Sequence, residues 1–177
     1  MAESFKDWAT VQSDLADNTT RSITARKVRD ALNSFRAFGG LLVVGGTTAT
    51  GALSATPTAI TLWTAVDANS TGVTANTTTG LTVEAAGLYE LTYSLSFGVS
   101  SAASEYQLGV LKDSETVFTT GTKQVYLTAS NTTYGPVVGH TILNLAAGAI
   151  LRLAVSVNTG TPTVTPKEGS LYVHRVA

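Results

Sequence analysis

The 177-residue sequence predicts an all-β fold, a sandwich or barrel of antiparallel strands, preceded by a short helical segment at the N-terminus. From about residue 41 onward, short segments rich in Val, Leu, Thr and Tyr recur between Gly, Asn, Asp and Ser, which is typical of sandwiches and barrels. No long helical pattern interrupts them, so a parallel α/β sheet is not expected. Residues 1–36 hold 11 of the 23 Asp, Glu, Lys and Arg residues, which places a boundary near Gly39-Gly40.

The clearest strand is predicted over residues 88–97. Its apolar residues alternate strictly with Glu, Thr and Ser, so one face of the strand is apolar and the other polar. The apolar face consists of Tyr89, Leu91, Tyr93, Leu95 and Phe97. We predict that these five side chains fill the core or pack at a contact between subunits.

The remaining strands are predicted from shorter patterns. They cover residues 41–44, 58–65, 80–84, 106–111, 117–119, 123–129, 141–145, 149–157 and 170–176. Ala146, Ala147 and Gly148 predict a turn that joins two of these segments as a hairpin-like pair. The polar residues 66–80 and 158–166 are predicted to be loops.

The first segment, residues 1–38, is predicted to form helical pieces that attach the protein to a partner. Thr24 is a suitable N-cap for the second helix, and the apolar residues that follow have helical spacing. Because a helix of about 12 residues is marginal alone in water, its apolar stripe needs a partner. That partner could be the β domain, a symmetry mate or a larger assembly. The predicted docking residues are Phe5, Trp8, Leu15, Ile23, Val28, Leu32, Phe35, Arg26 and Arg29.

Gly39-Gly40 is predicted to stop the second helix. Residues 39–54 then form a linker with the first strand, and residues 55–177 form the β domain. A solvated basic face is the favoured interpretation of Arg26 and Arg29, and docking onto an acidic neighbour is the alternative.

Composition excludes several classes of function. The net charge is −1, and no basic cluster occurs beyond Arg26, Lys27 and Arg29, so nucleic acid is not an expected partner. There is no Cys, hence no disulfide framework. No apolar run approaches the length of a membrane span, and the N-terminus does not resemble a signal peptide. We therefore expect no membrane partner, and a protein made in the cytoplasm that stays soluble until it assembles.

No motif for catalysis, metal or cofactor binding is present. The two histidines, His140 and His174, are predicted to be strand residues that face solvent or a subunit interface, because no triad is apparent around them. Residues 67–72 begin like a calcium loop but lack the acidic third ligand and the bidentate Glu. A polar loop is the favoured interpretation there. Glu84 and Glu90 do not form an apparent catalytic pair, so we predict no enzyme and no cofactor.

The β segment resembles the jelly-roll domain of tumour necrosis factor and of the globular heads of complement proteins. The resemblance rests on four motifs, at residues 87–93, 108–113, 145–153 and 169–173. It departs from the family at Ala149, where the family usually has Asp. The resemblance implies a jelly-roll β-sandwich that forms a homotrimer. It also implies that Tyr89, Tyr93 or Tyr172 could lie at the threefold axis, and that calcium binding stays an open alternative.

The N-terminal segment resembles a stretch found at the start of many phage virion proteins, over residues 15–24 and 28–34. This resemblance implies a structural protein of a bacteriophage virion. The expected partners are two further copies of the chain and the major capsid protein or another virion subunit, with a host surface glycan as a further candidate. A capsid decoration protein or head fibre is favoured, because the chain has no long shaft. The alternatives are a tail-fibre tip that binds a receptor and a tail adaptor. A hydrolase has no motif to support it.

Overall fold

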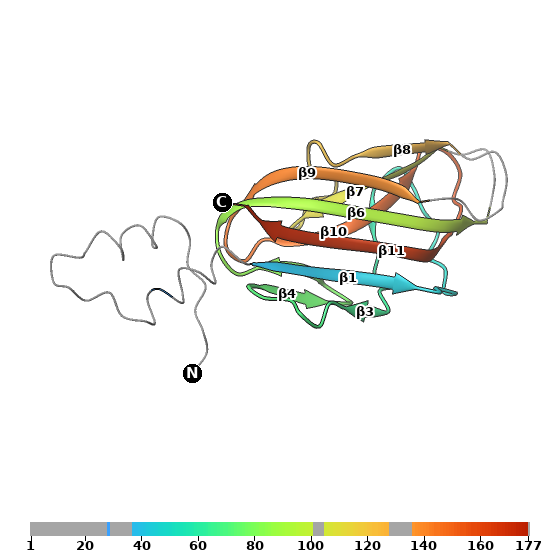
Figure 1. Ribbon diagram of the computed structural model, residues 1–177. Helices are drawn as coiled ribbons and strands as arrows, with labels where there is room; N and C mark the ends of the chain where they lie inside the picture. Colours follow the sequence, from blue (N-terminus) through green and yellow to red (C-terminus); the bar gives the residue numbers. More distant parts are fainter. Residues whose placement is uncertain (1–27, 29–36, 101–104, 128–135, 177) are drawn as a thin grey trace, which may run out of the picture.

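The computed structural model describes residue 28 and residues 37–100, 105–127 and 136–176. These residues form two antiparallel sheets packed face to face (Figure 1). The strands are β1 (Phe38–Val44), β2 (Thr58–Ala59), β3 (Ala65–Val66), β4 (Val73–Asn76), β5 (Gly80–Val83), β6 (Gly87–Val99), β7 (Glu105–Lys112), β8 (Gln124–Leu127), β9 (Val137–Leu145), β10 (Ile150–Val157) and β11 (Val164–Arg175). The described residues contain no helix of the length and apolarity that crossing a membrane would require.

The two sheets have the orders β3-β1-β11-β6-β9 and β4-β5-β10-β7-β8, and β2 pairs with β10 in the second sheet. Strands distant in sequence are neighbours in both: β11 lies between β1 and β6, and β10 pairs with β5 and β7. The all-β sandwich predicted from the sequence is confirmed.

The core lies between the sheets and is built by alternation along the long strands. The predicted apolar face of β6 points inward, and Tyr89, Leu91, Tyr93, Leu95 and Phe97 are at most 1% exposed. The Phe97 and Tyr106 rings meet there with centroids 5.7 Å apart, within the range of favourable aromatic pairs. The period-two pattern arises because successive side chains of a strand point to opposite faces of its sheet.

The predicted strand at 58–65 is broken in two by a crossing between the sheets. β2 pairs with Ala154 and Val155 in one sheet, whereas β3 pairs with Leu41 and Leu42 in the other. The residues between them run across the sandwich and bury Ile60 and Trp63. The apolar run therefore reflects burial between two layers rather than a single strand.

The hairpin predicted around residues 146–148 is wrong. β9 belongs to the first sheet and β10 to the second, so the turn carries the chain from one layer to the other. The backbone of the turn is held by β5 instead, because Gly148 N donates to Val83 O at 2.8 Å and Val83 N donates to Ala149 O at 3.0 Å.

The strand predicted at 117–119 is also wrong. Residues 113–123 form a loop that folds against β7, where Phe118 occupies the space that a side chain at Gly109 would need. Thr119 N donates to Val110 O at 2.8 Å, and no strand ladder develops. Conversely, residues 66–80 were predicted to be a loop, but they contain the strand β4. It is an edge strand in which only Val73 is buried, so its sequence carries little apolar alternation.

Gly39 and Gly40 lie inside β1, whereas the sequence predicted that they stop the second helix. Gly40 is required there because a β-carbon would overlap the Tyr172 ring. Residues after β1 also pack on the sandwich: Leu53 is 1% exposed, and Thr50 N donates to Val164 O at 2.7 Å. The division of the chain into an attachment segment and a β domain stays a prediction.

The first described strand and the end of the last one share one end of the sandwich (Figure 1). Ala37 is fully buried, and its carbonyl accepts a hydrogen bond from Arg175 N at 2.8 Å. The turn after β1 and the start of β11 lie at the opposite end, because β1 and β11 are antiparallel over their whole register.

We expect the stability of the fold to fall at alkaline pH because of two core tyrosines. Burial raises the pKa of Tyr89 and of Tyr93 above the usual 10.0. Since the folded-state pKa exceeds the unfolded one, the stabilisation is fully present below about pH 10 and is lost as the pH rises through the folded-state values. Urea unfolding at about pH 8 and about pH 11 measures the loss. Tyr93→Phe should reduce this loss of unfolding free energy between the two pH values. The same loss in that variant would contradict the assignment of the effect to Tyr93.

Candidate functional site

The candidate site is the outer face of the β3-β1-β11-β6-β9 sheet. We use "outer face" for the side chains of β9, β6, β11 and β1 that point away from the core. By strand register these are Val138, His140, Ile142 and Asn144; Leu88, Glu90, Thr92, Ser94 and Ser96; Glu168, Ser170, Tyr172 and His174; and Phe38, Gly40, Leu42 and Val44. Figure 1 shows these four strands side by side in one layer.

Aliphatic side chains are exposed across this face. Val44 is 63% exposed, Val138 is 56% exposed and Ile142 is 55% exposed. On β9 the outward residues Val138 and Ile142 alternate with His140 and Asn144 along the exposed side, while Val137 and Leu145 are buried on the inward side. A surface strand normally directs its apolar residues toward the core. β9 does so with Val137 and Leu145, and the further aliphatic residues that stay exposed on its outward side indicate that this face contacts another surface.

Three titratable side chains form a cluster on three adjacent strands of the outer face. His140 Nε2 lies 2.7 Å from Glu90 Oε1, and His174 Nδ1 lies 3.9 Å from Glu90 Oε2. All three side chains are roughly half exposed. An exposed pair of this kind contributes little to the stability of an isolated domain. It would count for more if a second surface covered it and excluded water.

The middle of the face is rich in hydroxyl groups. Ser94 Oγ and Ser170 Oγ lie 3.0 Å apart on neighbouring strands. Tyr172 lies across Gly40 of β1, where a β-carbon would overlap its ring. Tyr172 therefore adds an aromatic side chain, a residue type enriched in protein–protein interfaces, to this part of the face.

The structure corrects one expectation about this contact. Tyr89 and Tyr93 are fully buried inside the protomer, so they cannot line a contact between subunits. Of the three candidate tyrosines, only Tyr172 lies on the outer face. His140 and His174 are strand residues with exposed side chains, as the sequence predicts.

Most of the predicted docking residues lie outside the described residues. These are Phe5, Trp8, Leu15, Ile23, Arg26, Arg29, Leu32 and Phe35. Val28 is described: it is helical and 41% exposed. The role of the whole set in attachment stays a prediction.

The sequence reasoning did not assign a role to Val138 and Ile142. The signal was present in residues 137–145, where Val138 and Ile142 share one parity with His140, while Val137, Leu143 and Leu145 occupy the other. A strand with aliphatic residues on both faces is expected to have two packed sides. The sequence alone does not show which side is the core.

The fold of the described residues is a jelly roll similar to that of tumour necrosis factor. The solved structure of the tumour necrosis factor Eiger from S. frugiperda superposes with a TM-score of 0.52 at 15% identity, over 80% of this chain and 93% of that one. This likeness shows the fold and confirms the predicted jelly roll.

Two further structures are similar at lower scores. Vertex protein P5 of PRD1 has a TM-score of 0.46 at 16% identity, over 81% of this chain and 98% of that one. The globular domain of zebrafish complement 1qA has a TM-score of 0.44 at 12% identity, over 80% of this chain and 98% of that one. No protein-family model matches the chain, and no curated protein matches it.

Proposed function

We propose that the protein is a non-enzymatic, homotrimeric structural protein of a bacteriophage virion, with a capsid decoration protein or head fibre as the favoured form. The observation that carries the proposal is the outer face, which exposes Val44, Val138 and Ile142 beside the Glu90 cluster. Covering this face by copies of the chain removes the aliphatic side chains from water, and each buried CH₂ contributes about 0.8 kcal/mol. The trimeric state is supported by the sequence resemblance to trimeric jelly rolls.

The position of the chain ends supports attachment through the N-terminal segment. Ala37 leads into β1 at the end of the sandwich where Arg175 completes β11. If the residues that precede Ala37 bind the particle, this end of the sandwich would lie near the surface of the particle. The opposite end, with the turn after β1, would then point outward.

Two measurements test the proposal. Light scattering on the purified protein should give about three times the chain mass of 18.3 kDa. Quantitative mass spectrometry of purified particles should find copies comparable to the major shell protein. Only a few copies per particle would move the protein to the tail, as a receptor-binding tip or an adaptor. Absence from every particle would contradict the virion proposal.

Removal of residues 1–36 is expected to abolish attachment and leave the β domain folded. The cut is placed before Ala37 because this residue is buried and bonded to Arg175. Circular dichroism should show the same β signal for the truncated and full-length proteins. Pelleting with particles that lack the native protein should retain the full-length chain and lose the truncated one. Equal retention of both would show that the attachment site lies in the β domain.

A further inference from the structure

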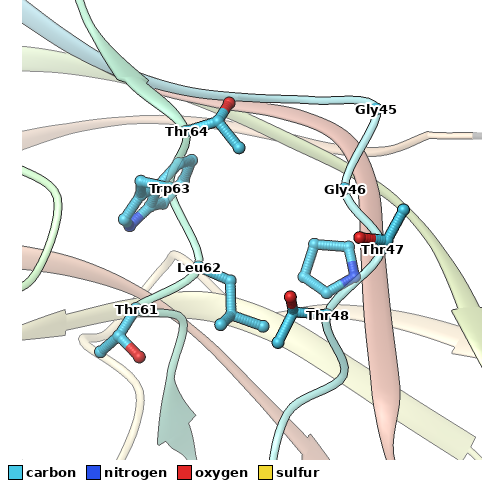
Figure 2. A pocket seen from close by; sticks show the side chains of 9 residues that line it. Gly45, Gly46, Thr47, Thr48, Thr61, Leu62, Trp63 and Thr64 are labelled. Atoms are coloured by element: carbon cyan, nitrogen blue, oxygen red, sulfur yellow. The ribbon is translucent and has the colours of Figure 1, made fainter.

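A hollow of about 340 Å³ opens beside the turn after β1 (Figure 2). This turn lies at the end of the sandwich far from Ala37 (Figure 1). Three segments distant in sequence form it: the turn after β1 at residues 45–48, residues 61–64 before β3, and Pro166 of β11. Its volume lies at the small end of the range for small-molecule sites, roughly 300–1,000 Å³.

The walls of the hollow are fixed to the sheet by hydrogen bonds. Thr64 N donates to Leu42 O at 2.9 Å, and Val44 N donates to Thr64 Oγ1 at 3.0 Å, which joins the second segment to β1. On the other side Gly46 N donates to Lys167 O at 3.1 Å.

The turn approaches β11 so closely that a β-carbon at Gly46 would overlap Pro166 O. A bulge in β11 between Pro166 and Glu168 lies at the same place. The hollow is thus largely pre-formed, and a ligand would not have to order it.

The lining of the hollow is neutral and combines hydroxyl groups with aliphatic carbon. Thr47, Thr48 and Thr61 are exposed, and within the described part of the chain none of their hydroxyls makes a hydrogen bond. Each can therefore donate and accept. Figure 2 shows Leu62 pointing into the hollow, whereas the Trp63 ring turns away from it. Pro166 completes the apolar part of the wall.

This chemistry selects a class of ligand. Among the residues that the structure describes, no charged side chain lines the hollow, so an anion or a cation would lose its hydration without gaining an ionic partner. A neutral sugar ring suits the lining, because its hydroxyls can bond to the threonines while its C–H face packs on Leu62 and Pro166. The buried Trp63 offers no stacking surface, which predicts a weak affinity for each site.

We propose that this hollow is a binding site for a neutral saccharide at the end of the domain opposite Ala37. The proposal goes beyond the structural role and does not depend on it, because sugar binding is a property of the isolated protein. In a trimer, three weak sites would act together, and avidity would raise the effective affinity for a polysaccharide surface.

The test uses the full-length protein and ligand-observed NMR with the methyl glycosides of glucose, galactose, mannose and N-acetylglucosamine. At least one neutral glycoside should bind, and glucose 6-phosphate and N-acetylneuraminic acid should not. Thr48→Val and Thr61→Val each remove one hydroxyl with little change of shape, and each should weaken binding by about threefold to tenfold. Thr116→Val, an exposed threonine outside the hollow, is the matched control and should bind as the native protein does.

Three results would overturn the proposal: no binding of any neutral glycoside at high millimolar concentration, a preference for the charged sugars, or unchanged binding in both hollow variants. Each can occur while the protein still trimerises and attaches to particles, so a failure here is distinct from a failure of the proposed structural function.

Discussion

Replacement of Gly139 by alanine is expected to destabilise the fold by about 3 kcal/mol or more. A β-carbon at this position would overlap Cζ and the hydroxyl of Tyr93 on the neighbouring strand. The Tyr93 ring cannot move aside, because it is fully buried and its hydroxyl donates a hydrogen bond to Thr122 O. The free energy of unfolding from urea titration measures the effect. Gly51→Ala is the control, since no atom lies within 4 Å of its β-carbon position, and its change should stay within about 0.5 kcal/mol.

A double-mutant cycle separates this overlap from a general intolerance of β9. Tyr93→Leu removes the ring atoms that meet the new β-carbon, at the cost of core packing and of the hydrogen bond to Thr122. In that background Gly139→Ala should cost much less than it does alone, with a coupling energy of about 1–3 kcal/mol. Additive losses would show that the alanine acts on something other than Tyr93.

The long strands could be predicted from the sequence because their cause is local. Alternation along β6 is a property of consecutive residues, and each of the five side chains predicted to point inward is buried as the period-two pattern indicates. The strand at 58–65 and the hairpin at 146–148 were predicted wrongly for the opposite reason. In both places the chain passes between the two sheets, and the partner strands are remote in sequence. Apolar content indicates that such a segment is buried, but it does not indicate between which layers the segment lies.

The outer face could be predicted only in part. The polar side of β6 is visible in the sequence, and Glu90, Thr92 and Ser94 suggest contact with water. The register with β9 sets Ile142 beside Glu90 and Val138 beside Ser94, which makes the combined surface partly aliphatic. Register between strands is a non-local property, because it depends on the packing of both faces. The Glu90, His140 and His174 cluster could not be found from spacing for the same reason, since its members come from β6, β9 and β11.

Val138→Asp is expected to convert the proposed trimer into monomers. Val138 is 56% exposed on β9, and its cross-strand partner is the uncharged Ser94, so the carboxylate should be tolerated by the isolated protomer. In the trimer each copy would bury one added carboxylate in a contact that the native chain fills with an aliphatic side chain, and an unpaired buried charge costs several kcal/mol. Because all three copies carry this cost, the protein concentration at which the trimer dissociates should rise by at least about a thousandfold. Light scattering across a dilution series measures the shift.

The matched control for this substitution is Val125→Asp. Val125 is 51% exposed and lies on β8, the edge strand of the opposite sheet, so the same charge is added to a strand of the same kind outside the outer face. This variant should keep the mass of the native assembly, and both variants should keep the β signal in circular dichroism. If Val138→Asp stayed trimeric at the native dissociation constant, the contact would lie on another surface. If Val125→Asp alone dissociated, the contact would involve the β8 edge, and the exposed aliphatic residues of the outer face would need a different partner.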